Sequence, residues 1–544
     1  MKGPFSAALL AAAALFVAGC SGRFESFQFQ TAEGARIEMR QSPRRSRADE
    51  TRFQPAPGRL ATPTYRLASP LAVPSGGQAF ALSYSNSLPD CRLTILSDKG
   101  AALKTAALPP SSGTRLRYLV PLKKGDRIWG FQLTTPSAGA AGSLELSGAG
   151  TAPFVHGFAI EQDGLAVDGS VAVLSASHGA VDARIPAATR QEMAQGIWAI
   201  EIGTQPAAGG GAVTFISEEG KSVVFDVSPS HAPNLLTFAR GSISFLPVEV
   251  KVAGAVTHLE ISQLSTEAPL PADPGSILTW DVASWRHPDF ELFSWDRFPH
   301  VLIFDTARYD VQDALFNRLA FFVEKAGHAG KIEPPSALAG IHGYNAHDYR
   351  AEDLARFFTA AGTQGVALSA AEEKLAALLV ENGVIQKTAS GYSPGEGGVI
   401  SISRGSSPIL RDLLLTHECF HGAFFSLPAF REATEKEWAS LSPVEQQVWK
   451  DFLASRSYNV EDHYLLVNEF QSYLLQQERL YVTGFQSLTL GRMRAASPAG
   501  AALVKRFLAA HPSSFLGSFD VLDGALQSAG GPPGGDAAAI RLAR

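Results

Sequence analysis

The stretch SSPILRDLLLTHECFHGAFF, residues 406–425, carries the pattern that decides how the second half of the chain folds. Ser407 and Pro408 are typical of a helix start, because serine caps the first N–H groups and proline fits the first helical position. After them, leucines recur at helical spacing on the same stripe as His417 and His421. The sequence therefore predicts that this stretch is a helix whose apolar face, with both histidines on it, packs inward.

The spacing of the two histidines suits a metal ion. In His417-Glu418-Cys419-Phe420-His421 the imidazoles lie four positions apart, so both reach the same side of a helix. Zinc binds imidazole nitrogen at about 2.0–2.1 Å and can keep one coordination position open for water. Glu418 would lie beside that position and could move a proton from the water to a leaving amine. We therefore expect one Zn²⁺ ion held by His417 and His421, with Glu418 as the catalytic base. The alternative is a pair of core histidines with hydrogen-bond partners.

A later helix is expected to supply the third ligand, because residues 468–473 read NEFQSY. Together the HExxH and NExxS patterns resemble the gluzincins, the thermolysin-like zinc metallopeptidases. The resemblance implies that Glu469 is the third metal ligand and that the chain hydrolyses peptide bonds with zinc-activated water. Tyr473 stands where the family has an aspartate that orients the first histidine. The partner of His417 therefore stays open, and a backbone carbonyl or a carboxylate such as Asp305 would serve.

The residues leave other ligands and roles open. A buried Glu469 could instead hydrogen-bond to a tyrosine or an arginine. Rival third ligands are His463, Glu461, Glu435 and Glu432. Candidates for transition-state stabilisation or for support of the ligands are Tyr473 and His463, and beyond them Tyr464, His342, Tyr344 and His347.

The strand ahead of the motif helix is a candidate for substrate binding. In the thermolysin-like enzymes that strand forms the edge that pairs with extended substrate, and Ser401–Arg404 could do this here. Arg404 would then bind a substrate carboxylate, or, more simply, form a surface salt bridge.

Around the two motif helices, the periodicity predicts a mostly helical α+β region over 277–528. The segments 301–304 and 397–403 have the apolar runs of buried strands. Helical spacing is found in the segments 311–325, 351–361, 369–381, 443–455 and 461–480. With the resemblance above, this region is expected to be a zincin-like metallopeptidase domain.

The first half of the chain follows a different pattern. Period-two alternation broken by Gly, Pro, Ser and Asn predicts two all-β modules of sandwich or jelly-roll type, over 65–150 and 151–265. Such modules could bind carbohydrate or protein, or serve as a spacer. Closely spaced prolines over 266–276 indicate a stiff linker. A Gly- and Pro-rich composition predicts a disordered tail over 529–544.

The beginning of the chain resembles the export signal of a bacterial lipoprotein. Lys2 precedes a short apolar run, and small residues lead to Cys20. The resemblance implies a signal peptide over 1–19, acylation of Cys20, and a lipid anchor in a membrane of the bacterial cell envelope, facing the periplasm or the exterior. Residues 20–64 are polar and are expected to form a tether or an irregular lead-in. No later segment offers about 20 uninterrupted apolar residues.

Composition limits the classes of partner and function. A chain of 544 residues with 45% hydrophobic content is expected to form several domains with real cores. A net charge of −6 without a long basic stripe argues against a nucleic-acid partner, and three cysteines exclude a disulfide framework. We therefore expect a membrane-anchored zinc hydrolase that acts on peptide or protein substrates. The alternatives are a non-enzymatic adhesin or scaffold with structural zinc, and an amidase for cell-wall or glycopeptide material.

Overall fold

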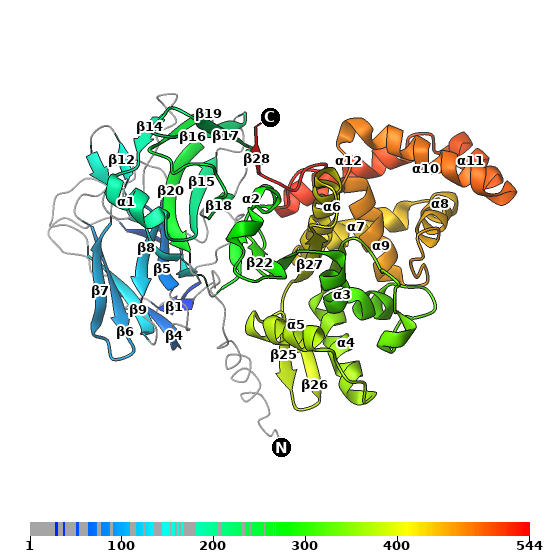
Figure 1. Cartoon of the computed structure of the whole chain (residues 1–544), viewed down its shortest axis with the longest axis horizontal. Coiled ribbons are helices and arrows are strands. Elements are labelled where there is room, and N and C mark those ends of the chain that lie inside the picture. Colours follow the sequence, from blue (N-terminus) through cyan, green and yellow to red (C-terminus); the bar gives the residue numbers. More distant parts are fainter. Residues whose placement is uncertain are drawn as a thin grey trace, which may run out of the picture.

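The computed structural model describes residues 268–543 without a gap. Before them it describes the stretches 28–30, 36–38, 51–53, 64–72, 78–86, 91–108, 116–122, 126–134, 144–152, 154–157, 160–162, 165–167, 181–204, 209–229, 234–239, 241–254, 256–264 and 266. The expected signal peptide over 1–19 and the expected acylation site at Cys20 lie outside the described residues. Figure 1 shows β sheets on the left and a helix-rich C-terminal region on the right.

The first β region consists of two antiparallel sheets, ordered β2-β1-β4-β9-β6-β7 and β3-β10-β5-β8. Its strands are β1 Gln28–Gln30, β2 Arg36–Glu38, β3 Thr51–Phe53, β4 Thr64–Ala72, β5 Gln78–Asn86, β6 Arg92–Ser97, β7 Ala102–Ala107, β8 Leu116–Leu122, β9 Arg127–Thr134 and β10 Leu144–Ala152. Both sheets contribute to one core, in which the rings of Tyr65 and Phe131 stack at 4.6 Å. Because β1, β2 and β3 pair with these sheets, the described parts of 20–64 are not a tether.

The second β region also has two sheets, ordered β11-β20-β15-β18 and β13-β12-β14-β19-β16-β17-β28. Its elements are β11 Phe154–Gly157, β12 Ile160–Gln162, β13 Leu165–Val167, β14 Val181–Arg184, α1 Ala187–Met193, β15 Trp198–Thr204, β16 Gly211–Ile216, β17 Ser222–Val227, β18 Asn234–Phe238, β19 Glu249–Gly254, β20 Val256–Leu264 and β28 Ile540–Leu542. The core between the sheets contains Trp198 and Phe238, whose rings stack at 4.6 Å.

The C-terminal region is built on a mixed five-stranded sheet, ordered β21-β22-β23-β27-β24. Its strands are β21 Leu270–Ala272, β22 Phe290–Trp295, β23 Val301–Thr306, β24 His347–Arg350 and β27 Gly398–Ser403, and a separate hairpin has β25 Ile385–Thr388 and β26 Gly391–Pro394. Its helices are α2 Pro274–Thr279, α3 Tyr309–Val323, α4 Ala351–Thr363, α5 Ala370–Glu381, α6 Pro408–Ser426, α7 Pro428–Ser440, α8 Pro443–Ala454, α9 His463–Leu475, α10 Val482–Ala496, α11 Pro498–Ala510 and α12 Ser514–Ala529. The helix expected over 461–480 is shorter, because α9 ends at Leu475 and a 3₁₀ turn follows at Arg479–Tyr481.

Alternate residues of the central strand β23 face two cores, one on each side of the sheet. Val301 and Ile303 lie in the core that includes α6, α7, α8 and α9, whereas Leu302 and Phe304 lie in the core formed with α3, α4 and α5. The strand is buried along its whole length for this reason. The motif helix α6 follows β27 directly and packs on the first of these two faces.

The stiff linker expected over 266–276 is wrong. Leu270–Ala272 forms β21, which is buried and pairs in parallel with β22. Pro271 is compatible with this position because β21 is an edge strand, where a missing N–H costs no ladder hydrogen bond. Its carbonyl accepts a hydrogen bond from Thr237 of the second β region at 2.6 Å. The segment therefore fastens the C-terminal region to the β region instead of separating them.

The disordered tail expected over 529–544 is also wrong. After α12 the chain returns to the second β region, where β28 adds an antiparallel strand to β17, shown in red in Figure 1. The buried carboxylate of Asp273 accepts hydrogen bonds from the N–H groups of Ala539 at 2.7 Å and Ile540 at 3.2 Å. Long-range pairing therefore orders a segment whose composition alone suggested fraying.

Residues from the second β region and the C-terminal region share a core. Leu235 and Leu264 of the β sheets lie in the same apolar cluster as Leu270 and Trp280. Asp296 strengthens this junction, because its carboxylate accepts the Leu235 N–H at 2.9 Å. Among the described residues, no helix combines the length and the apolar content needed to cross a membrane.

Candidate metal centre

Two helices, α6 and α9, position the centre, and α6 begins as its sequence predicts. Ser407 caps α6 by accepting the N–H of Leu410, and Pro408 occupies the first turn. Asp462 caps α9 in the same way. A hydrogen bond links the two helices where the motifs meet, because the Ser472 hydroxyl donates to the His417 carbonyl at 2.6 Å.

The side chains of His417, His421 and Glu469 converge as the sequence predicts. The Nε2 atoms of the two histidines lie 3.1 Å apart. Glu469 Oε2 lies 3.6 Å from Nε2 of His417, and Glu469 Oε1 lies 3.7 Å from Nε2 of His421. In a tetrahedral site with ligands at about 2.0–2.1 Å, neighbouring donor atoms are about 3.3–3.4 Å apart. The three side chains could therefore hold a single metal ion.

Burial sets the protonation of this group. It lowers the pKa of His417 to about 4, which keeps the imidazole in the neutral form that binds metal. Burial also raises the pKa of Glu469 to about 8, so this carboxylate needs a positive partner to stay ionised near neutral pH. Its Oε2 atom has no hydrogen-bond partner among the described residues, which fits a place for a cation.

Glu418 lies beside the three ligand candidates. A donor oxygen of its carboxylate, one of Asp348 and a ring nitrogen of His421 all lie within 4.8 Å of one another. Burial raises the pKa of Glu418 well above its usual range, and the neighbouring carboxylates of Asp348 and Glu469 raise it further. Such a side chain holds a proton readily, as a general acid and base must.

Asp348 is a residue of the centre that the sequence analysis missed. It lies on the edge strand β24, and its Oδ2 is 3.7 Å from Nδ1 of His421. Asn468, from the second motif, donates to the same oxygen at 3.2 Å. A carboxylate behind a ligand histidine fixes the orientation of its ring. The sequence offered His342, Tyr344 and His347 near it as candidates, and only the strand register could have identified the aspartate.

Two tyrosines, Tyr473 and Tyr458, contact the ligand candidates His417 and Glu469. Tyr473 packs its ring against His417 at 4.7 Å, which agrees with its expected supporting role. Tyr458 was missed; its hydroxyl interacts with the carboxylate of Glu469 and lowers the pKa that burial raises. A β-bridge between Lys325 and Tyr458 holds the loop, and Ser457 before it has a φ of 68°, a conformation few non-glycine residues adopt.

Asp305 is not the partner of His417. Its buried carboxylate binds Arg411 at 2.6 Å and Arg404 at 2.8 Å, below the first turns of α6. Arg404 also donates to the Trp280 carbonyl, so it forms a salt bridge with a buried acid and is not free for a substrate carboxylate. Asp348 and then Gln476, the residue directly after α9, raise the pKa of the His417 imidazole against the effect of burial.

The rival ligands lie away from the centre. The side chain of His463 is 64% exposed and binds Glu435 at 2.8 Å, so neither residue can be a ligand, and the supporting role expected for His463 is wrong. His463 precedes Glu469 by six positions, which places it about 240° around the helix. Glu432 pairs with Lys436 on the surface, and Glu461 is exposed.

The remaining candidates have structural partners. His342 binds Asp313 and Asn345, His347 is buried against the Tyr349 hydroxyl, and Tyr464 lies under the guanidinium of Arg350. Burial lowers the pKa of His347 to about 3. Tyr344 lies nearer to the centre than these three residues. Its ring stacks on that of Tyr458, the partner of Glu469, with the ring centroids 5.3 Å apart.

A second strand lies beside the start of the expected substrate edge. Gly398–Ser401 of β27 pair with β24, so within the expected edge Ser401–Arg404 only Ser401 is covered by β24. The outer position is taken by β24, His347–Arg350, which carries Asp348. An extended peptide that adds to this sheet would therefore pair with β24.

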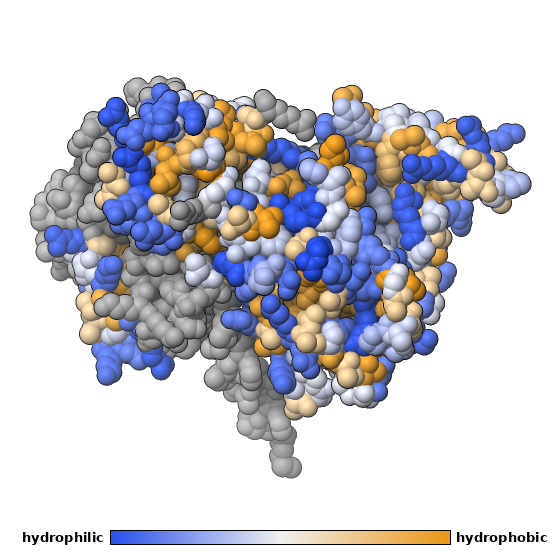
Figure 2. All heavy atoms as spheres, viewed as in Figure 1, coloured by the Kyte–Doolittle hydropathy of each residue, from blue (hydrophilic) through white to orange (hydrophobic). Residues whose placement is uncertain are grey.

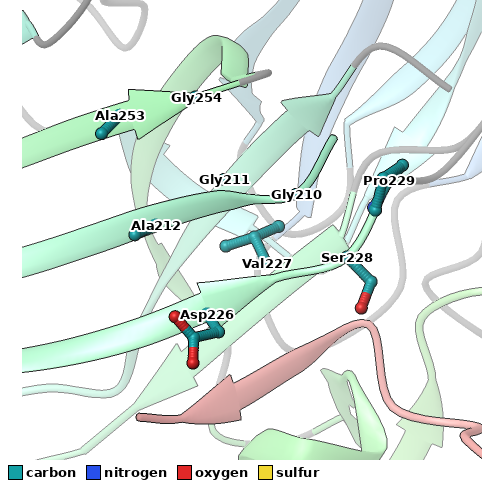
Figure 3. Close-up of a pocket in the computed structure, with 9 residues that line it drawn as sticks. All are labelled: Gly210, Gly211, Ala212, Asp226, Val227, Ser228, Pro229, Ala253 and Gly254. Atoms are coloured by element: carbon teal, nitrogen blue, oxygen red, sulfur yellow. The ribbon is translucent and has the colours of Figure 1, made fainter. Parts of the chain in front are cut away.

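A hollow of about 480 Å³ lies elsewhere, at the ends of β16, β17 and β19 (Figure 3). Its lining includes three glycines and one carboxylate, Asp226, all from the second β region. Sugar-binding sites usually present aromatic rings, and none of the residues described around this hollow is aromatic. The expected carbohydrate or protein binding of the β regions stays a prediction.

Comparison with known proteins adds little to this geometry. No family model matches the chain, and no curated protein matches it. Among solved structures, it is weakly similar to the glycoside hydrolase domain of Endo-D from Streptococcus pneumoniae R6, with a TM-score of 0.16 and 9% identity over 44% of this chain. The chain covers only 36% of that structure's length. It is also similar to a mutant of Bacillus subtilis oxalate decarboxylase, with a TM-score of 0.15 and 11% identity over 38% of this chain and 69% of that one. At these TM-scores the neighbours indicate neither the fold nor the activity of this chain.

Proposed function

We propose that the chain is a zinc-dependent hydrolase of the gluzincin type, a metallopeptidase whose C-terminal region is zincin-like. The observation that carries the proposal is the convergence of His417, His421 and Glu469 at the spacing of a tetrahedral site, with Glu418 alongside. Two imidazoles and one carboxylate are a common donor set of catalytic zinc, which leaves the fourth position for water.

Each side chain of the centre has a separate role in the proposed amide hydrolysis. A bound zinc ion would lower the pKa of its water and polarise the scissile carbonyl. Glu418 accepts the proton of the attacking water and returns it to the leaving amine. Asp348, whose carboxylate lies 3.7 Å from Nδ1 of His421, would orient that ring, and Tyr458 would hold the carboxylate of Glu469. Substrate backbone pairs with the edge strand β24, next to Asp348.

The same proposal covers location and partners. Acylation of Cys20 after removal of residues 1–19 would anchor the protein in a membrane of the bacterial cell envelope, facing the periplasm or the exterior. The two β regions, of sandwich or jelly-roll type, would then hold the catalytic region at a distance from that membrane or bind further carbohydrate or protein. The substrate is a peptide or protein.

Removal of the metal tests the function directly. A chelator should abolish cleavage of an unfolded protein substrate, and added zinc should restore it. The fold should persist in the chelator, because the sheet and helices around the centre form a large apolar core without help from an ion. Circular dichroism and thermal unfolding in the presence of the chelator check this second point.

Other outcomes separate the rival functions. If the protein shows no activity and the chelator unfolds it, the result would support a scaffold with structural zinc and not a hydrolase. Zinc-dependent release of peptides from cell-wall fragments, without cleavage of proteins, would identify the amidase. The assay therefore includes both classes of substrate.

Asp348→Asn should lower the affinity for zinc by about 10–100-fold, because the partner of His421 loses its charge. A competition titration against a chromogenic chelator measures this affinity. His463→Ala is the matched control, since His463 is an exposed histidine bound only to Glu435, and it should leave zinc affinity unchanged. Equal affinities for the Asp348 variant and the parent protein would show that Asp348 does not orient the ligand.

A further inference from the structure

The segment 479–519, which contains α10 and α11, carries positive charge without a single acidic residue. It holds five cations, Arg479, Arg492, Arg494, Lys505 and Arg506, and no aspartate or glutamate. The chain as a whole has more acidic than basic residues, 52 against 46. A positive surface element is therefore concentrated in a protein whose net charge is −6. We call residues 480–510, which comprise Leu480, Tyr481, α10 and α11, the basic hairpin.

Four of these cations are available to a partner. Arg492, Arg494, Lys505 and Arg506 are exposed, and none of them forms a salt bridge with another described residue. Arg479 differs, because it binds Asp520 with two hydrogen bonds of 2.7 Å. The free positive charge thus lies on the two helices themselves.

Apolar side chains are exposed on the same element. Leu480 is 79% exposed, Leu488 65%, Tyr481 58% and Leu508 42%. Leu488 and Arg492 lie four positions apart on α10, and Lys505 and Leu508 lie three positions apart on α11. Residues at these spacings are neighbours on a helix surface, so on each helix one exposed leucine lies beside a cation.

The opposite face of the basic hairpin fixes its position. Leu490, Leu503, Val504 and Phe507 are buried in the core of the C-terminal region. Figure 1 shows the hairpin in orange at the right-hand end of the molecule, far from the β regions. Figure 2 shows hydrophilic and hydrophobic atoms side by side over this end. The exposed face is therefore presented outward by a rigid support.

We propose that the basic hairpin is a docking surface for anionic phospholipid, separate from the metal centre and from any lipid anchor. Surfaces that combine Lys and Arg with Leu and Tyr lie at the boundary between headgroups and acyl chains. The cations meet the phosphates while the leucines and the tyrosine enter the apolar layer.

The exposed apolar residues favour a lipid over other polyanions. A nucleic acid offers phosphates to the cations but leaves leucines such as Leu480 and Leu488 in water. An acidic protein partner would need a surface that matches the separate leucines, whereas a fluid lipid layer accepts them without shape complementarity. A phospholipid surface is therefore the occupant that uses both features.

Vesicle binding by the chain without an acyl group tests the proposal. The protein is residues 20–544 with Cys20→Ser, and the probe is vesicles of phosphatidylethanolamine with phosphatidylglycerol, compared with vesicles of phosphatidylcholine alone. Co-sedimentation at increasing salt should show binding to the anionic vesicles that weakens as salt rises. Each cation near such a surface contributes roughly fivefold in affinity, which corresponds to about 1 kcal/mol.

The quadruple variant R492Q/R494Q/K505Q/R506Q should lose binding by on the order of several hundredfold. The matched control is K99Q/K104Q/K221Q/K387Q, which removes the same charge from four exposed lysines elsewhere and should bind as the parent does. L488S/L508S should lower affinity by roughly tenfold while preserving the salt dependence. Unchanged circular dichroism and an unchanged unfolding temperature establish that each variant is folded.

Three results would overturn the proposal. If the parent and R492Q/R494Q/K505Q/R506Q bound vesicles equally well, the basic hairpin would not be the docking surface. If both quadruple variants lost the same affinity, the net charge of the protein would explain the binding. Tighter binding to a single-stranded nucleic acid or to polyglutamate than to anionic vesicles would assign the surface to another polyanion. None of these results depends on whether the metal centre is active.

Discussion

Replacing Glu418 with glutamine should lower the turnover of a peptide substrate by about 10²–10⁴-fold while zinc stays bound. Glutamine has nearly the same size as glutamate, but its amide cannot accept a proton from the attacking water. The three ligand candidates, His417, His421 and Glu469, are unchanged in this variant. Turnover measured beside the zinc content of the same preparation separates loss of the base from loss of the ion.

Glu435→Gln is the control for this variant, because Glu435 is an exposed carboxylate that binds His463 outside the centre. Its turnover should equal that of the parent protein. A Glu418 variant with full zinc and undiminished turnover would remove Glu418 from the mechanism. One that lost its zinc would instead show that the carboxylate supports the ion.

Removing residues 530–544 should lower the free energy of unfolding by several kcal/mol. The truncated chain loses β28 and the fully buried side chain of Ile540, whose replacement by alanine alone should cost about 2–5 kcal/mol. Asp273 also loses the N–H groups of Ala539 and Ile540, which leaves a buried carboxylate with fewer donors. Chemical denaturation of the two variants measures both effects.

Leu542→Ala is the matched control, since Leu542 lies on the same strand but its side chain is 48% exposed. It should change the free energy of unfolding by less than about 0.5 kcal/mol. If Ile540→Ala and Leu542→Ala had the same small effect, the C-terminal strand would contribute little to stability.

The parts of the centre that the sequence predicts are those that local spacing encodes. His417 and His421 share one face of a helix because they are four positions apart, and that relation holds wherever the helix lies. Glu469 was identified through a motif on another helix, and its convergence with the histidines is a long-range fact that the structure adds. Helices α3, α4, α5, α6, α8 and α9 and the strand before α6 followed from periodicity in the same local way, whereas α2, α7, α10, α11 and α12 were not predicted.

The parts that were missed depend on contacts between distant segments. Asp348 reaches His421 only because β24 pairs with β27, and Tyr458 reaches Glu469 only because a bridge to Lys325 holds its loop. Composition predicted a linker around Pro271 and a disordered tail around Ile540. Both segments are instead ordered by pairing with a distant strand, β21 with β22 and β28 with β17. Neither pairing has a periodic signature in its own short segment.

The position of β28 has a consequence for how the protein is made. The ribosome synthesises β17 early. Its partner β28 is synthesised only after the rest of the C-terminal region. Until then β17 is the last strand of its sheet, with unpaired N–H and C=O groups that can pair with another chain. Nascent chains arrested before Ile540 should therefore recruit chaperones or aggregate, and closure of that sheet is a late event in biogenesis.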